Sequence, residues 1–214
     1  MRTNDIMPVK DTEREYRAFE PLSVPNVDPQ STGYVVEGYA STFERYALFE
    51  MDGVTYSEQI SPRAFDNCDF SDVIMQYNHS GPVYARTRNK TLKVEIDEHG
   101  LHIRADLSKT TKSRELYEDI ATGLVDRMSF AFTVAEDHWD AETHTRHIDK
   151  VKKVYDVSAV SLPANPGTDI GLATRSAYDG YIEADKQEML AKEARAKKAK
   201  MLELKIKLIA GNNK

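Results

Sequence analysis

Apolar and polar residues alternate one by one along short segments of this chain, and this period of two constrains the fold more than any other feature. In the segment 101–107, Leu101, Ile103, Ala105 and Leu107 alternate with polar residues. Such a pattern buries one face of a strand and exposes the other. Further runs rich in β-branched, aromatic and other apolar residues predict strands at 34–43, 73–77, 92–96, 128–134 and 151–162.

Turn and cap residues divide these strands. The polar residues 97–100 end in glycine and predict one hairpin, and residues 137–149 predict another. Between them lies one helix, with Ser108, Thr110 and Thr111 as candidate N-caps and Gly123 as its end. Many strands, few helices and no alternation of strand and helix predict a mostly antiparallel sheet or barrel.

Three regions differ in texture. Residues 1–30 are polar and lack a sustained period, which predicts a flexible leader, and residues 31–180 form the main domain. Residues 181–214 predict an amphipathic helical tail, with a seam that Lys197 interrupts. This seam consists of Leu190, Ala194, Met201, Leu204 and Leu208.

Charge and composition exclude several classes of protein. Residues 185–214 carry nine Lys or Arg against four Asp or Glu, so the net charge of −6 leaves −11 on residues 1–184. An acidic body is unlike a nucleic-acid-binding protein. We expect no membrane partner and no signal peptide, because no apolar run is long enough. The single cysteine, Cys68, excludes an internal disulfide and fits a reducing compartment.

Two strand-like runs deliver catalytic residue types. His79 follows the run 73–77 and precedes a predicted turn at 80–82, and Ser129 lies in the run 128–134. A histidine can remove the proton of a serine hydroxyl, which then attacks a carbonyl carbon. Small residues share the face of Ser129, which predicts an open surface for a substrate strand. A structural histidine and an ordinary surface serine are the alternatives.

Asp156 offers a carboxylate that can orient the histidine. The alternation places it on one strand face with Val154 and Ser158, partly buried. Asp126 and Asp169 are the alternative partners. The order His, Ser, Asp differs from that of the three well-known triad folds, which is acceptable because geometry defines a triad.

The sequence gives less support to a catalytic cysteine and to a metal site. Acidic neighbours should raise the pKa of the Cys68 thiol and make it a poor nucleophile. His138, His144 and His147 have a spacing that suggests zinc, but no cysteine or strict motif supports it. We therefore expect no metal and no cofactor.

Together these segments resemble the prohead proteases of tailed bacteriophages, serine peptidases that mature the capsid. The resemblance runs from about residue 33 to residue 173. Two positions depart from the family pattern: Asp156 replaces a usual glutamate, so a shorter reach is expected, and Ala131 stands where glycine is common. The marks of the resemblance lie, in order, at 38–43, 60–65, 78–79, 100–101, 123–124, 128–130, 156–158 and 162–166.

The resemblance implies His79 as general base, Ser129 as nucleophile and Asp156 as third member. It also implies a closed antiparallel β-barrel with flanking helices, as in herpesvirus capsid-maturation proteases. The position of the loop 163–167 makes backbone amides there, including Ala164 and Asn165, candidates for stabilising an oxyanion.

The implied substrates are the major capsid protein, the scaffold, or both, together with the chain itself. The implied location is inside the assembling prohead in the host cytoplasm, and the expected state is a homo-oligomer such as a dimer. One rival hypothesis is an inactive capsid scaffolding protein with the same fold. The other, an esterase acting on small molecules, lacks the motif Gly-x-Ser-x-Gly.

Overall fold

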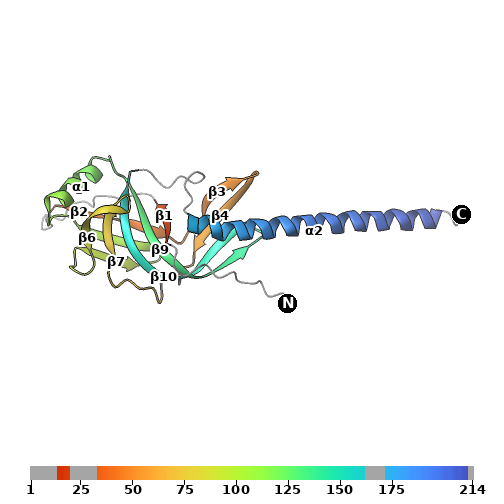
Figure 1. Cartoon of the computed structure of the whole chain (residues 1–214), viewed down its shortest axis with the longest axis horizontal. Helices are drawn as coiled ribbons and strands as arrows, with labels where there is room; N and C mark the ends of the chain where they lie inside the picture. Colours follow the sequence, from red (N-terminus) through yellow and green to blue (C-terminus); the bar gives the residue numbers. More distant parts are fainter. Residues whose placement is uncertain (1–13, 20–32, 162–171, 212–214) are drawn as a thin grey trace. The chain divides into compact units, whose positions relative to one another are not determined.

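The computed structural model of the chain describes residues 14–19, 33–161 and 172–211 (Figure 1). The chain divides after Thr174 into two compact units, Met1–Thr174 and Arg175–Lys214. The first unit contains every described strand. The described part of the chain is therefore mostly β, as the alternating patterns predicted.

The larger sheet is built around two long strands, β9 (Arg127–Asp140) and β10 (Thr145–Val160). Seven described strands make up this sheet, and five of them follow the order β1-β9-β10-β4-β3. Strand β10 pairs in parallel with β4 at residues 145–148 and with β5 at residues 156–159. The remaining members are β1 (Glu15–Phe19), β3 (Tyr46–Met51), β4 (Val54–Ile60), β5 (Ile74–Tyr77) and β6 (Ser80–Arg86).

The smaller sheet has the order β2-β8-β7, from β2 (Val35–Thr42), β8 (Gly100–Asp106) and β7 (Leu92–Ile96). The predicted hairpin joins β7 to β8, and the Asp97 carboxylate accepts hydrogen bonds from the backbone N–H groups of His99 and Gly100. A Cβ atom at Gly100 would lie 2.0 Å from the backbone oxygen of Ser41. Glycine is therefore required where β8 approaches the end of β2.

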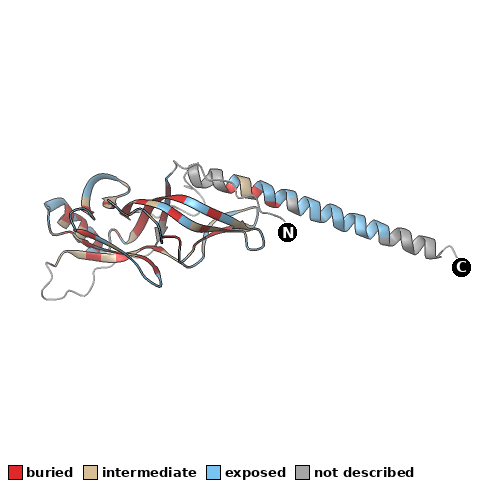
Figure 2. Ribbon diagram, turned by 90° about the horizontal axis from the view of Figure 1, so that it is seen from below, coloured by how far each residue is buried: buried red, intermediate tan, exposed pale blue. Residues whose placement is uncertain are grey.

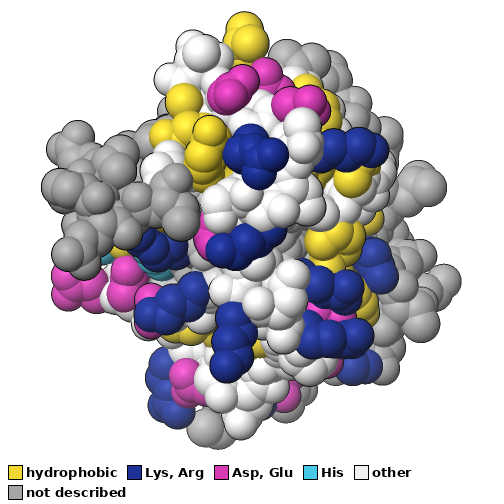
Figure 3. Space-filling model, turned by 90° about the vertical axis from the view of Figure 1, so that its left-hand side faces the viewer, with side chains coloured by type: hydrophobic (Ala, Val, Ile, Leu, Met, Phe, Trp, Pro, Cys, Tyr) yellow, Lys and Arg dark blue, Asp and Glu magenta, His cyan; other side chains and the backbone are white. Residues whose placement is uncertain are grey.

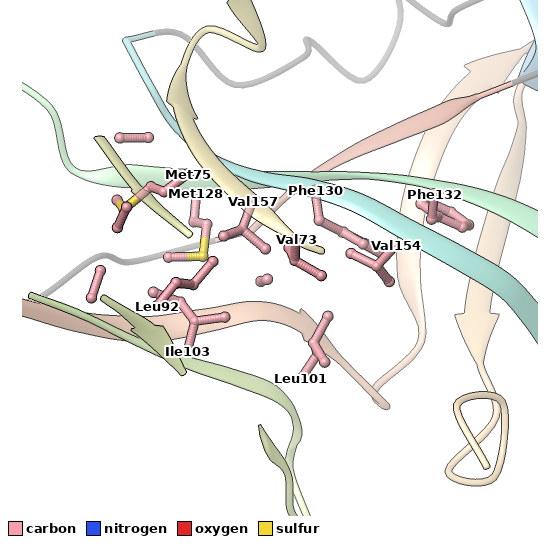
Figure 4. Close-up of a cluster of buried hydrophobic side chains, with 14 of the residues drawn as sticks. Val73, Met75, Leu92, Leu101, Ile103, Met128, Phe130, Phe132, Val154 and Val157 are labelled. Carbon is pink, nitrogen blue, oxygen red and sulfur yellow. The ribbon is translucent and has the colours of Figure 1, made fainter. Parts of the chain in front are cut away.

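The core lies between the two sheets. Met128, Phe130 and Val157 of the larger sheet belong to the same buried cluster as Leu101 and Ile103 of the smaller sheet, and Figure 4 shows the two sets facing each other. The periodicity of two explains this arrangement, because alternate residues of β8 and β9 reach the same layer.

The two described helices have different settings. The helix α1 (Thr111–Ala121) begins where Thr110 accepts a hydrogen bond from the Ser113 N–H at 3.0 Å, and Gly123 follows its end with a φ of 75°. The helix α2 (Leu172–Gly211) confirms a long C-terminal helix but begins before residue 181. Its side chains at 189–202 are exposed (Figure 2).

The closed antiparallel barrel is the main structural prediction that fails. In the described part of the chain the ladders form two separate sheets, and β10 pairs in parallel with β4 and β5. The sequence alternation identifies strands but is silent on their partners, because both directions of pairing accept the same pattern of buried residues.

Two further segments differ from the sequence analysis. Residues 15–19 fell within the predicted leader, yet they form β1 and pair with β9. The hairpin of β3 and β4 was also missed, although Asp52-Gly53 turns it with positive φ at both residues, as a tight hairpin requires. A dipeptide of this kind is a usable sequence signal.

Charge is mixed on the face of the molecule that Figure 3 shows. Lys and Arg side chains lie there among acidic and hydrophobic ones. Within the described residues, neither α1 nor α2 combines the length and hydrophobicity that crossing a membrane requires.

Candidate active site

His79 occupies a two-residue turn between β5 and β6. Tyr77 pairs with Ser80, and the intervening Asn78 and His79 have φ values of 49° and 54°. Positive φ at both central residues is characteristic of the type I′ hairpin turn, whose backbone twist fits the right-handed twist of the flanking strands. Asparagine tolerates this conformation, whereas for histidine it costs about 1 kcal/mol. The turn therefore starts two residues before the predicted turn at 80–82, and residues 80–86 form the strand β6, which the sequence analysis did not predict.

Hydrogen bonds of Asn78 connect this turn to the end of β10. Its backbone N–H donates to the Ala159 carbonyl at 3.0 Å, and its side-chain oxygen accepts from the Ser161 N–H at 3.1 Å. The strained His79 backbone is thus held by contacts on the neighbouring residue.

Ser129 lies near the start of β9, where β9 pairs with β1 on one side and with β10 on the other. It is opposite Ala18 of β1 and Ser158 of β10. Met128 and Phe130 point into the core, so the side chain of Ser129 points to the other face of the sheet.

A bulge in β10 sets the direction of Asp156. Val154 pairs with Phe132 and Asp156 with the next residue, Ala131, so Tyr155 is an extra residue on β10. The extra residue changes the phase of the alternation. Val154 consequently joins the core, while Asp156 lies on the face of Ser129, which corrects the prediction that Val154 and Asp156 share a face.

The imidazole of His79 bridges the other two residues. Its Nε2 lies 2.7 Å from Ser129 Oγ, and its Nδ1 lies 2.6 Å from Asp156 Oδ1. Both are hydrogen-bond distances, and they involve opposite ring nitrogens. The structure therefore brings His79, Ser129 and Asp156 together, and the aspartate side chain is long enough to reach the ring.

The face around Ser129 is not the open surface that the small residues predicted. Ser129 is 3% exposed, and Ala131 and Thr133 are also buried. The imidazole of His79 folds onto this face, and the Tyr16 ring of β1 meets that imidazole edge-on, with centroids 4.6 Å apart. Small side chains on β9 thus make room for the histidine.

The other candidate residues lie elsewhere or outside the described residues. Asp126 is 3.8 Å from Arg127 and has a largely exposed side chain. Asp169, Ala164 and Asn165 fall outside the described residues, so the predicted oxyanion donors stay a prediction.

Cys68 is a poor nucleophile for a different main reason than expected. Burial raises the pKa of its thiol to about 12, and the Asp69 carboxylate adds to this effect. A thiol with such a pKa holds almost no thiolate at neutral pH.

The three hairpin histidines do not converge on one point. His138 stacks on His147 with centroids 4.7 Å apart and contacts the Asp149 carboxylate at 2.5 Å, whereas His144 contacts Tyr56 and Trp139. Burial and neighbouring His138 lower the pKa of His147. Within the described ranges, no group of three or more potential ligands is arranged to hold a metal ion.

A buried ionic network, missed in the sequence analysis, joins β1 to the body of the larger sheet. Arg146 contacts Asp137 at 2.5 Å and Glu15 at 2.7 Å, and Arg17 contacts Glu15 and Glu58 at 2.6 Å. All five side chains are nearly or fully buried. Burial raises the pKa of Glu15, but the two guanidinium groups outweigh burial and lower it to about 2.

The network was missed because charged residues on a polar segment normally indicate solvent exposure. A weak signal exists in β1, where Tyr16 and Ala18 alternate with Glu15 and Arg17. The alternation was therefore present in β1, but its charged residues, Glu15 and Arg17, are the buried ones and form part of the ionic network.

Comparisons with known proteins found the following similarities. A family model described as Caudovirus prohead serine protease matches residues 20–180. The prohead protease of Enterobacteria phage HK97 is 28% identical over 150 residues, which cover 68% of this chain and 62% of that protein. The match therefore spans less than two thirds of the relative's length. No solved structure matches the chain.

Proposed function

Because the chain belongs to the Caudovirus prohead serine protease family, we propose that it is a serine endopeptidase that cleaves capsid or scaffold protein during prohead maturation. The observation that carries this proposal is the imidazole of His79, with Ser129 Oγ at 2.7 Å on one nitrogen and Asp156 Oδ1 at 2.6 Å on the other. An inactive scaffolding protein would have no need to keep these three side chains in register.

The proposed reaction uses the two ring nitrogens in different roles. His79 Nδ1–H donates to Asp156, which leaves Nε2 free to accept the proton of the Ser129 hydroxyl as Oγ attacks the peptide carbonyl. The imidazolium then gives that proton to the leaving amine, and an acyl-enzyme remains on Ser129. Water, activated by the same nitrogen, hydrolyses the acyl-enzyme and restores the hydroxyl.

The tetrahedral intermediate needs hydrogen-bond donors for its oxyanion. We assign this role to backbone N–H groups in the segment that follows β10, including those of Ala164 and Asn165. The position of this segment in the chain supports the assignment, since β10 carries Asp156 and is followed by Ser161, whose N–H donates to the side chain of Asn78 beside His79.

We further propose the substrates of the chain and the place where it acts. The substrates are the major capsid protein, the scaffold or both, together with the chain itself, inside the assembling prohead in the host cytoplasm. The chain acts as a homo-oligomer such as a dimer. Residues 31–180 carry the chemistry, and residues 181–214 deliver the protease to the shell.

Co-expression with the capsid protein of the same phage tests the proposal. The wild-type chain should shorten the capsid protein, as seen by mass spectrometry of the intact product. Ser129→Ala and His79→Ala should each abolish this cleavage while the variants fold, because triad members act as a unit. His99→Ala, at a largely exposed histidine, is the matched control and should cleave normally. Normal processing by Ser129→Ala would refute the mechanism.

A further inference from the structure

Ser158 is a fourth polar residue in contact with the triad. Its Oγ donates a hydrogen bond of 2.7 Å to Asp156 Oδ1, the same oxygen that faces His79 Nδ1 at 2.6 Å. Ser158 is fully buried and Asp156 is 3% exposed. A hydroxyl hidden from water and directed at the orienting carboxylate is well placed to act through that carboxylate.

The backbone of Ser158 is held from both sides. It pairs with Ser129 on β9 and with Gln76 on β5, in the ladders that also position Asp156. The two residues are two positions apart on β10, so their side chains share a face. Since the bulge at Tyr155 lies before both of them, it turns Ser158 and Asp156 to the triad face together.

A single hydrogen bond from His79 would leave the Asp156 carboxylate free to rotate about its Cβ–Cγ bond. Rotation would exchange the two oxygens and tilt the imidazole away from Ser129. A second donor on the same oxygen restricts this rotation, and hydrogen bonds to an ionised carboxylate are stronger than neutral ones. On the basis of the proposed function, we infer that Ser158 is a positioning residue that holds Asp156 Oδ1 against His79.

The first test is kinetic and uses the full chain with a peptide that spans the cleavage site found by co-expression. Ser158→Ala should lower kcat by about 10-fold to 100-fold with little change in KM, because it loosens the orientation of the reacting groups. Ser158→Cys replaces the hydroxyl by a somewhat larger thiol that donates a weaker hydrogen bond, so its kcat should fall between those of Ser158→Ala and wild type. Ser113→Ala is the matched control, since Ser113 is a buried serine whose Oγ donates to the Tyr84 carbonyl, and its kcat should stay unchanged.

The second test separates action through Asp156 from a general structural role. In an Asp156→Asn background, Ser158→Ala should lower kcat less than 3-fold further, because coupled residues are not additive. An undiminished loss in that background, or a wild-type kcat for Ser158→Ala, would overturn the inference.

The third test needs no activity. Proton NMR should show a low-field Nδ1 proton of His79, assigned by its absence in His79→Ala, and Ser158→Ala should move it upfield. An unmoved resonance would overturn the role of Ser158 and leave the proposed protease function intact. A protein without peptidase activity but with the expected NMR shift would refute the function alone.

Discussion

Arg146→Met should be among the most destabilising substitutions in the first unit. The guanidinium of Arg146 is completely buried and reaches Asp137, Glu15 and Glu58 at distances from 2.5 to 3.2 Å. Its loss would leave three buried carboxylates facing one remaining guanidinium of the network, that of Arg17. Removing one partner from a buried ion pair typically costs about 3–5 kcal/mol.

The pKa of Glu15 leads to a similar magnitude. The difference between its ordinary value of 4.5 and its folded value of about 2 corresponds to about 3 kcal/mol of stability. Because the pKa is lower in the folded state, this contribution is fully present above pH 4.5 and is lost as the pH falls through about 2. Without Arg146 the pKa of Glu15 should rise, so the variant has less of this contribution to lose.

Urea denaturation at several pH values measures both effects, with fluorescence of Trp139, the only tryptophan, as the probe. At pH 7, Arg146→Met should unfold with a free energy about 3–5 kcal/mol below that of wild type, and the gap should narrow between pH 4.5 and pH 3. Arg63→Met is the control, since this exposed arginine pairs with Asp66 at 2.9 Å and should cost less than about 0.5 kcal/mol. A loss below about 1 kcal/mol, or a gap that stays constant down to pH 3, would refute the reasoning.

Three other predictions concern single sites and the tail. Asp156→Asn should lower kcat/KM by about 10⁴-fold in the peptide assay, less than Ser129→Ala, because the nucleophile and base remain; activity equal to wild type would show that another acid orients His79. Gly100→Ala should destabilise by about 1–3 kcal/mol in thermal unfolding, because its Cβ would lie 2.0 Å from the Ser41 oxygen, and an unchanged melting temperature would contradict that close approach. A chain ending at Gly180 should cleave the peptide in solution but fail to enter proheads in a co-assembly assay; a misfolded truncated chain would show that the tail is needed for folding.

The candidate site was more predictable from sequence than the sheet topology. His79, Ser129 and Asp156 could be named because each residue type stands at or near a strand, and chemistry restricts which types can form a triad. Their roles rest on resemblance and on the proposal, whereas their meeting is a property of the fold. The distances of 2.6 and 2.7 Å join residues 77 and 50 positions apart in sequence.

Local rules also predicted α1 and the hairpin of β7 and β8. Thr110 and Gly123 form hydrogen bonds with residues only three positions away, so the local sequence is enough to predict where the helix begins and ends. The same locality explains the failure in β1. The local sequence predicts that Glu15 and Arg17 are exposed to solvent. They are buried because Arg146 and Glu58, from strands distant in the sequence, pair with them.

The sequence by itself indicated the strands that alternate or are richly apolar, and it named His79, Ser129 and Asp156 as candidate site residues, because these inferences depend on periodicity and on residue type. Tertiary structure alone decided that β10 pairs in parallel with β4 and β5, that the two sheets remain separate in the described residues, and that five charges are buried together. It also decided the direction of Asp156, since the bulge at Tyr155 arises from the register of β10 against β9. Register is a relation between distant segments, and no local pattern encodes it.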